Sequence, residues 1–542
     1  MCKNVSHYIK KSWKLCALAC ACLIVRWGLT ALMQLVMARS VTSAMQFDLR
    51  GFLAWTAANF GLWGANSGIS ALGTWFQARA VRDMNNRVRH DLYLSLLAKG
   101  HREFHSRDTG EYLSWLTGNI KQIERLAWTP FFDCVGRTAH IVWCVLALAS
   151  FHWAMLAAGL VSAGVMILAP RLFEKRMAGL GAACTAAEAE GTGRLKDLLC
   201  GFDVLRSFGQ TDRFLRQGDA CSDRMEEPNC RRSYVQFNLN RAVSLAATVM
   251  QILQEVLAVV LAIRGEVIMG ALASAGNLTA GITSGLNSIA NDRMSMASAR
   301  SCFAHITVRA GNAPSPAEPD AAPLRQAITV ENLSFGYGDR PVLQNLSLRF
   351  EVGGKYAVTG PSGCGKSTLL KLLLGWLPDY GGTIRFDGKD ARDFTPEQRQ
   401  RQMSYIEQNV FLFASTLRDN ITLGEAFTDG QMEKALRDSA LAGDLDSLPE
   451  GLDTAVGEGG GNLSGGQKQR AAIARALIHS RSILLVDEGT SALDQRNADI
   501  VERSLLDNPD LTLILVSHHL TPERKAQFTR VYELRPGESA GG

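Results

Sequence analysis

The stretch KYAVTGPSGCGKSTLLKLLLGWL (355–377) restricts the fold of this chain more than any other. A short apolar strand runs into a glycine-rich loop, and an apolar helix follows the loop. Glycines at this spacing turn consecutive backbone N–H groups inward around phosphate oxygens, and the helix N-terminus adds partial positive charge. The loop matches GxxxxGK[ST], which places Lys366 near the β- and γ-phosphates and Ser367 on Mg²⁺. The stretch therefore predicts an α/β nucleotide-binding domain.

Two further apolar runs end in side chains suited to phosphate chemistry. SILLVDE (482–488) reads as a strand that ends in Asp487 and Glu488. Ligands of open α/β sheets bind at the carboxyl ends of the strands, so we predict that Asp487 helps to hold Mg²⁺ and that Glu488 polarises the attacking water. LTLILVS (511–517) ends at two adjacent histidines, either of which could reach the same phosphate.

The N-terminal part of the chain carries long apolar runs. Spanning a membrane takes about 20 mostly apolar residues. Six candidate spans meet that length: 13–37, 51–78, 130–151, 153–171, 240–263 and 267–290. The lysines before the first span place the N-terminus in the cytoplasm. The short connections then lie outside, and the long charged segments 79–129 and 172–239 lie inside.

Two charged residues fall within these candidate spans, Arg26 in the first and Glu255 in the fifth. A charge in the middle of a membrane costs about 2.5–3.5 kcal/mol on insertion scales and usually faces a partner or a cavity. Two interpretations stay open. The residues fix helix packing through polar contacts, or they line a cavity that touches a substrate.

Composition indicates where the domains begin and end, and it argues against some kinds of partner and site. GNAPSPAEPDAAPLRQA (311–327) has four prolines among small and polar residues, which is typical of an extended linker. We therefore predict an all-α transmembrane domain (1–310), a linker (311–327) and an α/β nucleotide-binding domain (328–542). The net charge is only +5 without a dense basic block, so no nucleic-acid partner is expected. The 12 cysteines show no metal-ligand spacing and are interpreted as reduced, structural residues.

Together these residues resemble the ATP-binding-cassette family. LSGGQ (463–467) is the signature of that family, and it occurs here with the phosphate loop, the DE pair and a SALD sequence (491–494). The resemblance implies catalytic roles for Lys366, Gln408, Glu488 and His518, with Mg²⁺ at Ser367, Gln408 and Asp487. The positions that it assigns to ATP are Tyr337, Gly360, Pro361, Ser362, Gly363, Cys364, Gly365, Lys366, Ser367, Thr368, Ser464, Gly465, Gly466, Gln467 and Asp494.

The N-terminal part resembles the six-helix exporters of that family. The likeness is carried by LYLSLLAKGHREFHSRDTGEYLSWLTGNIKQIE (92–124) and LLCGFDVLRSFGQTDRF (198–214). It implies that Gly118–Glu124 and Leu198–Phe208 are the short helices that contact the nucleotide-binding domains. The chain departs from the usual pattern at Ile120, which follows Asn119 where an aspartate is usual, at Gly489 and at Cys364.

In this family the signature of one cassette faces the phosphate loop of another, so the resemblance implies a dimer of half-transporters, either homodimer or heterodimer. The expected activity is ATP-driven export of a small molecule, lipid or peptide from a multi-pass protein of the bacterial inner membrane, with the cassette in the cytoplasm. An importer on the same fold, for instance of iron chelates, is an alternative. A cassette ATPase without transport is disfavoured by the six candidate spans.

Overall fold

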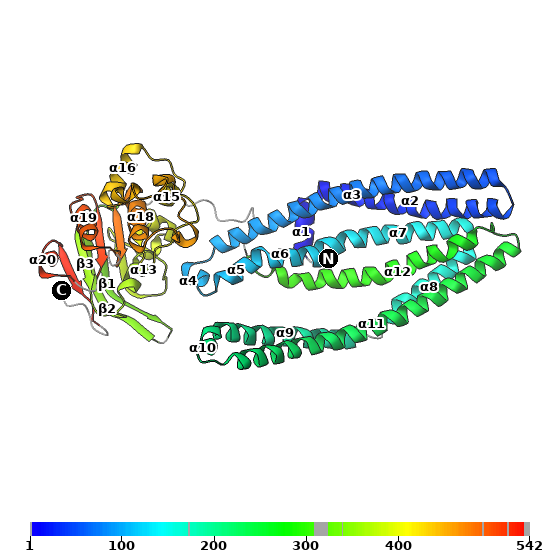
Figure 1. Cartoon of the computed structure of the whole chain (residues 1–542), viewed down its shortest axis with the longest axis horizontal. Coiled ribbons are helices and arrows are strands. Elements are labelled where there is room, and N and C mark those ends of the chain that lie inside the picture. Colours follow the sequence, from blue (N-terminus) through cyan, green and yellow to red (C-terminus); the bar gives the residue numbers. More distant parts are fainter. Residues whose placement is uncertain are drawn as a thin grey trace. The chain divides into compact units, whose positions relative to one another are not determined.

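The structure, a computed structural model, divides the chain into two compact units. The described residues are 3–171, 174–307, 324–338, 340–489, 493–517 and 520–535. The first unit comprises Met1–Ala98 and Asp108–Gly311, and the second comprises Lys99–Arg107 and Asn312–Gly542. Long helices form the first unit and both β-sheets lie in the second, so the predicted helical region followed by an α/β domain is confirmed (Figure 1).

Five of the six predicted spans lie within a long helix of the first unit, and the sixth, 267–290, begins four residues before its helix. These helices are α2 (Trp13–Met45), α3 (Leu49–Leu97), α7 (Thr129–Phe151), α8 (Trp153–Arg171), α11 (Thr211–Ile263) and α12 (Ala271–Ser298). Among the described residues, the stretches Trp13–Met45, Thr109–Phe151 and Thr211–Ile263 are long and apolar enough to cross a membrane. In the described part of the fourth span, Trp153–Val165 is a shorter apolar helix. The protein is an integral membrane protein by its apolar helices.

Helices α2 and α7 pack through contacts between glycines and aromatic rings. A Cβ atom added at Gly28 would lie 3.0 Å from the ring of Trp143, and one added at Gly136 would lie 3.0 Å from Nε1 of Trp27. The Trp27 ring in turn stacks on His140 with the centroids 4.1 Å apart. Small residues let helix backbones approach closely where no water drives the helices together. These glycines therefore set the spacing of these two membrane helices.

The segment after α5 (Thr109–Leu116) is part of the core of the first unit. It comprises α6 (Gly118–Ile123) and a single π-helical turn, η1 (Glu124–Trp128). Ile120, Ile123 and Trp128 are buried there beside α1 (Lys3–Lys11) and α3. The apolar side chains of 118–124 thus belong to the core of the first unit, and the contact of this segment with a nucleotide-binding domain stays a prediction. The residues that pack with the second unit are Lys99–Arg107, which contain the short helix α4 (His101–Phe104).

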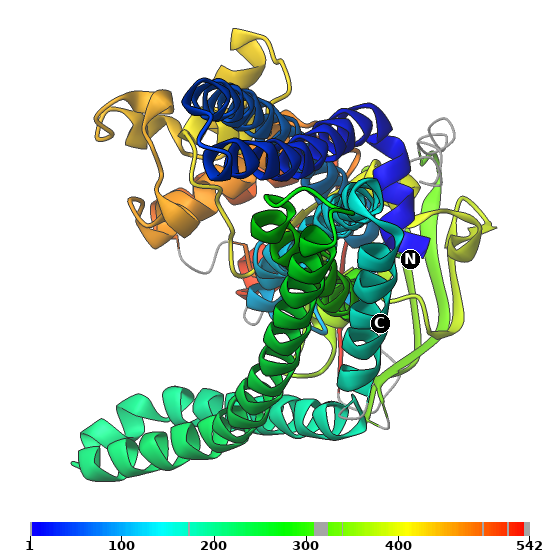
Figure 2. The same cartoon turned by 90° about the vertical axis from the view of Figure 1, so that its right-hand side faces the viewer.

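The second long inner segment forms a helical hairpin. Helices α9 (Glu174–Cys200) and α11 run side by side, and α10 (Phe202–Ser207) makes the turn between them (Figures 1 and 2). Apolar residues around this turn face solvent, with Val204 60% and Phe208 76% exposed. The hairpin therefore ends in an apolar tip that the first unit itself does not cover.

The second unit contains two sheets. One is antiparallel with the order β2-β1-β4-β5, and the other is parallel with the order β6-β7-β8-β3-β9. The antiparallel strands are β1 (Ala327–Tyr337), β2 (Arg340–Glu351), β4 (Gly381–Phe386) and β5 (Lys389–Asp390). The parallel strands are β3 (Lys355–Thr359), β6 (Met403–Ile406), β7 (Ile483–Asp487), β8 (Thr512–Val516) and β9 (Arg530–Glu533).

Helices surround the parallel sheet. They are α13 (Lys366–Leu373), α14 (Pro396–Gln400), α15 (Leu417–Thr422), α16 (Asp429–Asp438), α17 (Ala442–Leu445), α18 (Gly465–Ile478), α19 (Gln495–Leu506) and α20 (Pro522–Lys525), with short 3₁₀ turns between some of them. Every residue of β3, β7 and β8 is buried, as expected of parallel strands that are covered on both faces. Because these three strands are parallel neighbours, their carboxyl ends meet at one edge. Most of the predicted linker lies outside the described residues.

One carboxylate ties the start of β1 to the turn after β4. Asp387 accepts hydrogen bonds from the backbone N–H groups of Arg325, Gln326 and Ala327 at 2.7, 2.7 and 3.0 Å. Burial alone would raise the pKa of Asp387, but these three donors together with the charge of Arg325 hold that pKa below its usual value.

We predict that Asp387→Ala lowers the melting temperature of the second unit by a few degrees at neutral pH. A lowered folded pKa stabilises the protein above the unfolded pKa of about 3.9, and that stabilisation is lost as the pH falls through the folded pKa. The difference between variant and wild type should therefore vanish in acid, as measured by thermal unfolding of the purified protein along a pH series. Asp393→Ala, at an exposed position nearby, is the control. A difference that is independent of pH would contradict the prediction.

Candidate functional site

The loop between β3 and α13 has the backbone of a phosphate cradle. Gly360, Gly363 and Gly365 have φ angles of 148°, 81° and 100°, which residues with a Cβ rarely adopt. The Nζ of Lys366 donates to the carbonyl oxygens of Gly360 at 2.8 Å and of Pro361 at 3.0 Å. The lysine side chain thus folds across the loop itself, where phosphate oxygens could replace the carbonyls as acceptors.

The remaining predicted loop residues divide between surface and core. Pro361 and Ser362 are exposed, whereas Cys364 and Thr368 are buried. Sγ of Cys364 lies 2.9 Å from the position that a Cβ of Gly360 would take. The thiol therefore fills the space beneath the loop, which gives the departure at Cys364 a packing reason.

Ser367 and Asp487 form an oxygen-rich pair at the carboxyl edge of the parallel sheet. The Ser367 hydroxyl donates to Oδ1 of Asp487 at 3.0 Å. The other carboxylate oxygen, Oδ2, accepts a hydrogen bond from the hydroxyl of Tyr405 at 3.2 Å. Hydroxyl and carboxylate oxygens are the ligands that Mg²⁺ prefers, so this pair fits a magnesium ion.

Glu488 follows β7 directly and is held in an unusual conformation. Its φ of 55° lies in the left-handed region, which costs a non-glycine residue about 1–3 kcal/mol unless the surroundings enforce it. Three contacts enforce it here. Its N–H donates to the carbonyl of Val516 at 3.2 Å, Nε2 of Gln469 donates to its carbonyl at 3.2 Å, and Nε2 of Gln408 donates to its carboxylate at 2.8 Å. Gln408, predicted at the metal, thus orients Glu488.

The residue after Glu488 also has a packing reason. A Cβ added at Gly489 would lie 2.5 Å from Cγ1 of Val486. Alanine, which is usual at this position in the family, would require one of the two to move. The glycine is therefore matched to the valine that precedes the two acids.

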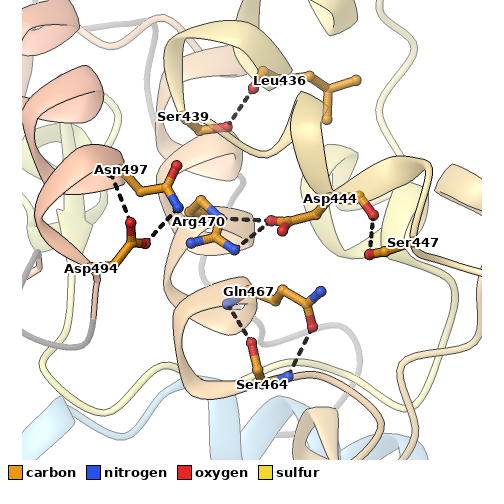
Figure 3. A network of polar contacts seen from close by, with 9 residues as sticks. All are labelled: Leu436, Ser439, Asp444, Ser447, Ser464, Gln467, Arg470, Asp494 and Asn497. Atoms are coloured by element: carbon orange, nitrogen blue, oxygen red, sulfur yellow. Dashed lines mark hydrogen bonds and ion pairs between the residues drawn. The ribbon is translucent and has the colours of Figure 1, made fainter.

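The LSGGQ sequence begins helix α18. Ser464 is the N-cap residue: its Oγ accepts from the backbone N–H of Gln467 at 3.2 Å, and Oε1 of Gln467 accepts from the N–H of Ser464 at 2.9 Å (Figure 3). This reciprocal capping box fixes the direction of the first helical turn. The first N–H groups of a helix have no partner within it, so those of Gly465 and Gly466 are donors for an external group.

Arg470, one turn further along α18, joins three elements. Its Nε and Nη2 atoms contact Oδ2 of Asp444 at 2.7 and 2.6 Å, and its charge also helps to lower the pKa of Asp494. The largest contribution to that lowered pKa is the hydrogen bond from Asn497. Figure 3 shows the guanidinium between these two aspartates. Arg470 thus links α17, α18 and the N-terminus of α19, which Asp494 caps.

Three predicted positions remain. Tyr337 lies at the end of β1, 45% exposed and edge-on to Phe335 with ring centroids 5.0 Å apart, so one face of its ring is accessible. Thr490–Ala492 and the pair His518–His519 lie outside the described residues.

The membrane unit contains a cavity of 830 Å³ between α2, α7 and α12. Its lining is Ile24, Phe131, Cys134, Val135, Thr138, Ala139, Val142, Trp143, Arg293, Met296 and Ala297. Seven of these eleven side chains are hydrocarbon or aromatic, and Met296 adds an apolar thioether. The polar atom of Trp143 is already satisfied, because Nε1 donates to the carbonyl of Ile24 at 3.1 Å. Arg293, near the end of α12, is the charged residue of the lining.

Neither Arg26 nor Glu255 lines this cavity. The guanidinium of Arg26 lies 5.3 Å from the ring of its neighbour Trp27. The carboxylate of Glu255 accepts from Gln251 at 3.2 Å and packs against Gly276 of α12. Both charged groups thus make polar or ring contacts within or between helices, and the choice between the packing and the cavity interpretation stays open.

Comparison with known protein families identifies the family of this chain. The family model described as ABC transporter matches residues 343–491, and the model of the ABC transporter transmembrane region matches residues 16–286. The chain belongs to the ABC transporter family. It carries the membrane region and the ATP-binding region on one polypeptide and couples ATP hydrolysis to transport.

Individual relatives agree with the fold. An ATP-dependent lipid A-core flippase of Photobacterium profundum is 28% identical over 77% of this chain and 73% of the relative. A mycobactin import ATP-binding/permease protein, IrtB, of Mycolicibacterium thermoresistibile is 41% identical over 37% of this chain and 35% of the relative. The solved structure of a bacterial Atm1-family ABC exporter with ATP bound has a TM-score of 0.79 at 22% identity and covers 98% of this chain and 95% of its own.

We predict that Arg470→Met lowers the stability of the second unit by about 1.5–3 kcal/mol, the usual range for hydrogen bonds to charged groups. The Arg470 and Asp444 side chains are 7% and 20% exposed, so the unpaired carboxylate would remain partly buried. Thermal unfolding of the purified protein measures the loss.

Replacing Asp444 with Asn in the same protein should recover part of that stability, because no unpaired charge then remains. A double variant that is less stable than Arg470→Met alone would contradict this account of the ion pair.

Proposed function

We propose that this protein is an ATP-driven exporter half-transporter that acts as a dimer. The observation that carries the proposal is that one chain has one phosphate loop and one LSGGQ cap on different elements. In the described part of the chain, no hydrogen bond joins the loop 360–368 to residues 463–467. A nucleotide that needs both must take them from two chains. Both elements are present here, so two copies of this chain suffice for two sites.

The hairpin tip supports a second chain. Exposed apolar side chains around α10 include Leu199, Val204 and Phe208. Contiguous apolar patches of this kind mark interaction sites. The partner that we propose for the tip is the ATP-binding unit of the second copy, as the exporter resemblance implies.

We assign a task to each group of the proposed ATP site. Lys366 and the loop N–H groups bind the β- and γ-phosphates, and the ring of Tyr337 stacks on the adenine. Glu488, oriented by Gln408, accepts a proton from the attacking water. Mg²⁺ held by Ser367 and Asp487 would neutralise charge on the phosphate oxygens. Donors from Ser464, Gly465 and Gly466 of the second chain would complete the site.

Export is the better supported direction. The relative named as a flippase aligns with 77% of this chain, whereas the one named for mycobactin import aligns with 37%. The bacterial origin of these relatives supports a location in the bacterial inner membrane. The ATP-binding unit would lie in the cytoplasm, on the side of the N-terminal lysines.

The cavity of the membrane unit suggests the class of substrate. Its wall is mostly apolar, and its charged group is the guanidinium of Arg293. Arg137 on the neighbouring helix is paired with Asp292 at 3.1 Å, so its charge is largely balanced. Apolar pockets with a few polar groups bind ligands by burying an apolar body and orienting one polar end. We therefore propose an amphiphile with an anionic head group as the substrate.

We predict that Glu488→Gln binds ATP but loses most of its turnover. Gln keeps the shape and the hydrogen bond to Gln408 but cannot accept the proton. General-base groups contribute about 10²–10⁴-fold. ATPase activity of the purified dimer, together with nucleotide-induced thermal stabilisation, measures both properties. Turnover at the wild-type rate would remove the assigned role, and loss of ATP binding would show that the residue is needed for a different step.

We also predict that Arg293→Ala raises the concentration of an anionic amphiphile needed for half-maximal stimulation of ATPase by about tenfold, since a desolvated charge-assisted contact contributes about 1.5–3 kcal/mol. Dodecyl phosphate is the probe and dodecyl maltoside, which is uncharged, is the comparison. Arg26→Ala serves as the matched control and should leave the response unchanged. Equal effects of the two variants would contradict a special role for Arg293.

A further inference from the structure

The short helix α4 belongs to the second unit and packs on the rest of that unit through a ring stack. The imidazole of His101 lies on the indole of Trp376 with centroids 4.0 Å apart and planes 12° from parallel. Arg102 and Asp379 approach each other to 4.0 Å beside it. Burial, together with the nearby charges of His105 and Lys371, lowers the pKa of His101 to about 4. The ring is therefore neutral at physiological pH and stacks without a charge to desolvate.

Trp376 contacts a second aromatic ring, that of Tyr405, on the side of the core. Its ring meets that of Tyr405 edge to face, with the centroids 5.2 Å apart and the planes 88° from parallel. Both rings pack against the core that contains β3 and α13. Aromatic pairs in this geometry contribute about 0.5–1.5 kcal/mol beyond the burial of their area. A displacement of either ring would therefore be resisted by the other.

The hydroxyl of Tyr405, the third ring after those of His101 and Trp376, reaches the candidate ATP site. It donates to Oδ2 of Asp487 at 3.2 Å, and Oδ1 of the same carboxylate accepts from Ser367. An ionised carboxylate can only accept hydrogen bonds, so the phenol of Tyr405 is the donor. One carboxylate oxygen is thus held by the tyrosine, and the other is turned toward the phosphate loop.

We propose that Tyr405 is a positioning residue for Asp487, and that the rings of His101 and Trp376 hold Tyr405 in the orientation that this hydrogen bond needs. This inference rests on the proposed function in one respect, the role of Asp487 as a metal ligand. All four residues belong to the second unit. The two ring contacts limit the positions open to the phenol, and the hydrogen bond of the phenol limits the orientations open to the carboxylate of Asp487.

The arrangement differs from a contact that merely holds the two parts of the second unit together. A carboxylate that is hydrogen-bonded on one oxygen has fewer orientations open to the other, which favours metal binding. Groups that hold a metal ligand in this way commonly contribute 10–100-fold to metal affinity or activity. The phenol hydroxyl is the one polar atom of the ring series that touches a proposed ligand residue.

The first experiment compares Tyr405→Phe with Tyr532→Phe in the purified full-length protein. Tyr532 is an equally suitable control, because it is buried and its hydroxyl donates to the carbonyl of Arg349 at 2.7 Å, away from the acids. The readout is the thermal stabilisation by ATP, titrated with Mg²⁺ and repeated in EDTA.

For Tyr405→Phe we expect the Mg²⁺ midpoint to rise about tenfold, with the stabilisation by ATP in EDTA unchanged. Tyr532→Phe should keep the wild-type midpoint. A wild-type midpoint in Tyr405→Phe would overturn the positioning role. Absence of any ATP stabilisation in the wild type would instead contradict the proposed function, so the two failures are distinguishable.

The second experiment tests the connection to α4. We expect His101→Ala to raise the same midpoint in protein with Tyr405 and to leave it unchanged in protein that already carries Tyr405→Phe. Residues that act through one another show such non-additivity, whereas independent residues add. Equal effects of His101→Ala in both backgrounds would overturn the connection. Arg102→Ala, which loses the neighbouring ion pair but not the stack, is the control and should leave the midpoint at the wild-type value.

Discussion

The hydrogen bond between Ser367 and Asp487 joins the two strands on which the ATP site depends. It links the loop after β3 to the end of β7, although β8 lies between these strands in the sheet. The bond requires the three strands to be parallel and in register, so that their carboxyl ends meet. The left-handed backbone of Glu488 depends on the same edge, because its N–H is bonded to the last residue of β8. A shift of one strand would separate the loop, the metal pair and the base together.

The membrane unit follows a different rule. Glycines on one helix receive aromatic rings from the next, as at Gly28 with Trp143 and at Gly136 with Trp27. Close approach at these points leaves a neighbouring space that the helices do not fill, and this space is the cavity. Trp143 belongs to both, since one part of the ring packs on Gly28 and the ring also lines the cavity. Packing and ligand binding therefore share residues in this unit, and substitutions there would affect both.

Local sequence was enough to predict the phosphate loop and the three strands beside it, because each depends on neighbours in the chain. The LSGGQ sequence was identified by resemblance alone, and its capping box was not predicted. Local sequence could not show which contacts form between distant residues. The burial of Ile120 and Ile123 depends on packing against other helices. The pocket lined by Arg293 likewise depends on how helices far apart in the chain pack together. Gln469 and Tyr405 were missed. The signal that could have identified Gln469 is a glutamine on the buried side of a helix. For Tyr405 it is a phenol in a strand, three residues before Gln408.

Serine as the N-cap of α18 has a chemical consequence. Aspartate or asparagine would cap this helix about as well. A hydroxyl, however, accepts the N–H of Gln467 with a lone pair and keeps its own hydrogen for another acceptor. Ser464 can therefore cap the N-terminus of the helix and, in the same geometry, donate to a phosphate oxygen held by the facing chain. A carboxylate would cap the helix equally well but would repel the phosphate. The choice of serine therefore lets the start of this helix recognise an anion as well as begin the helix.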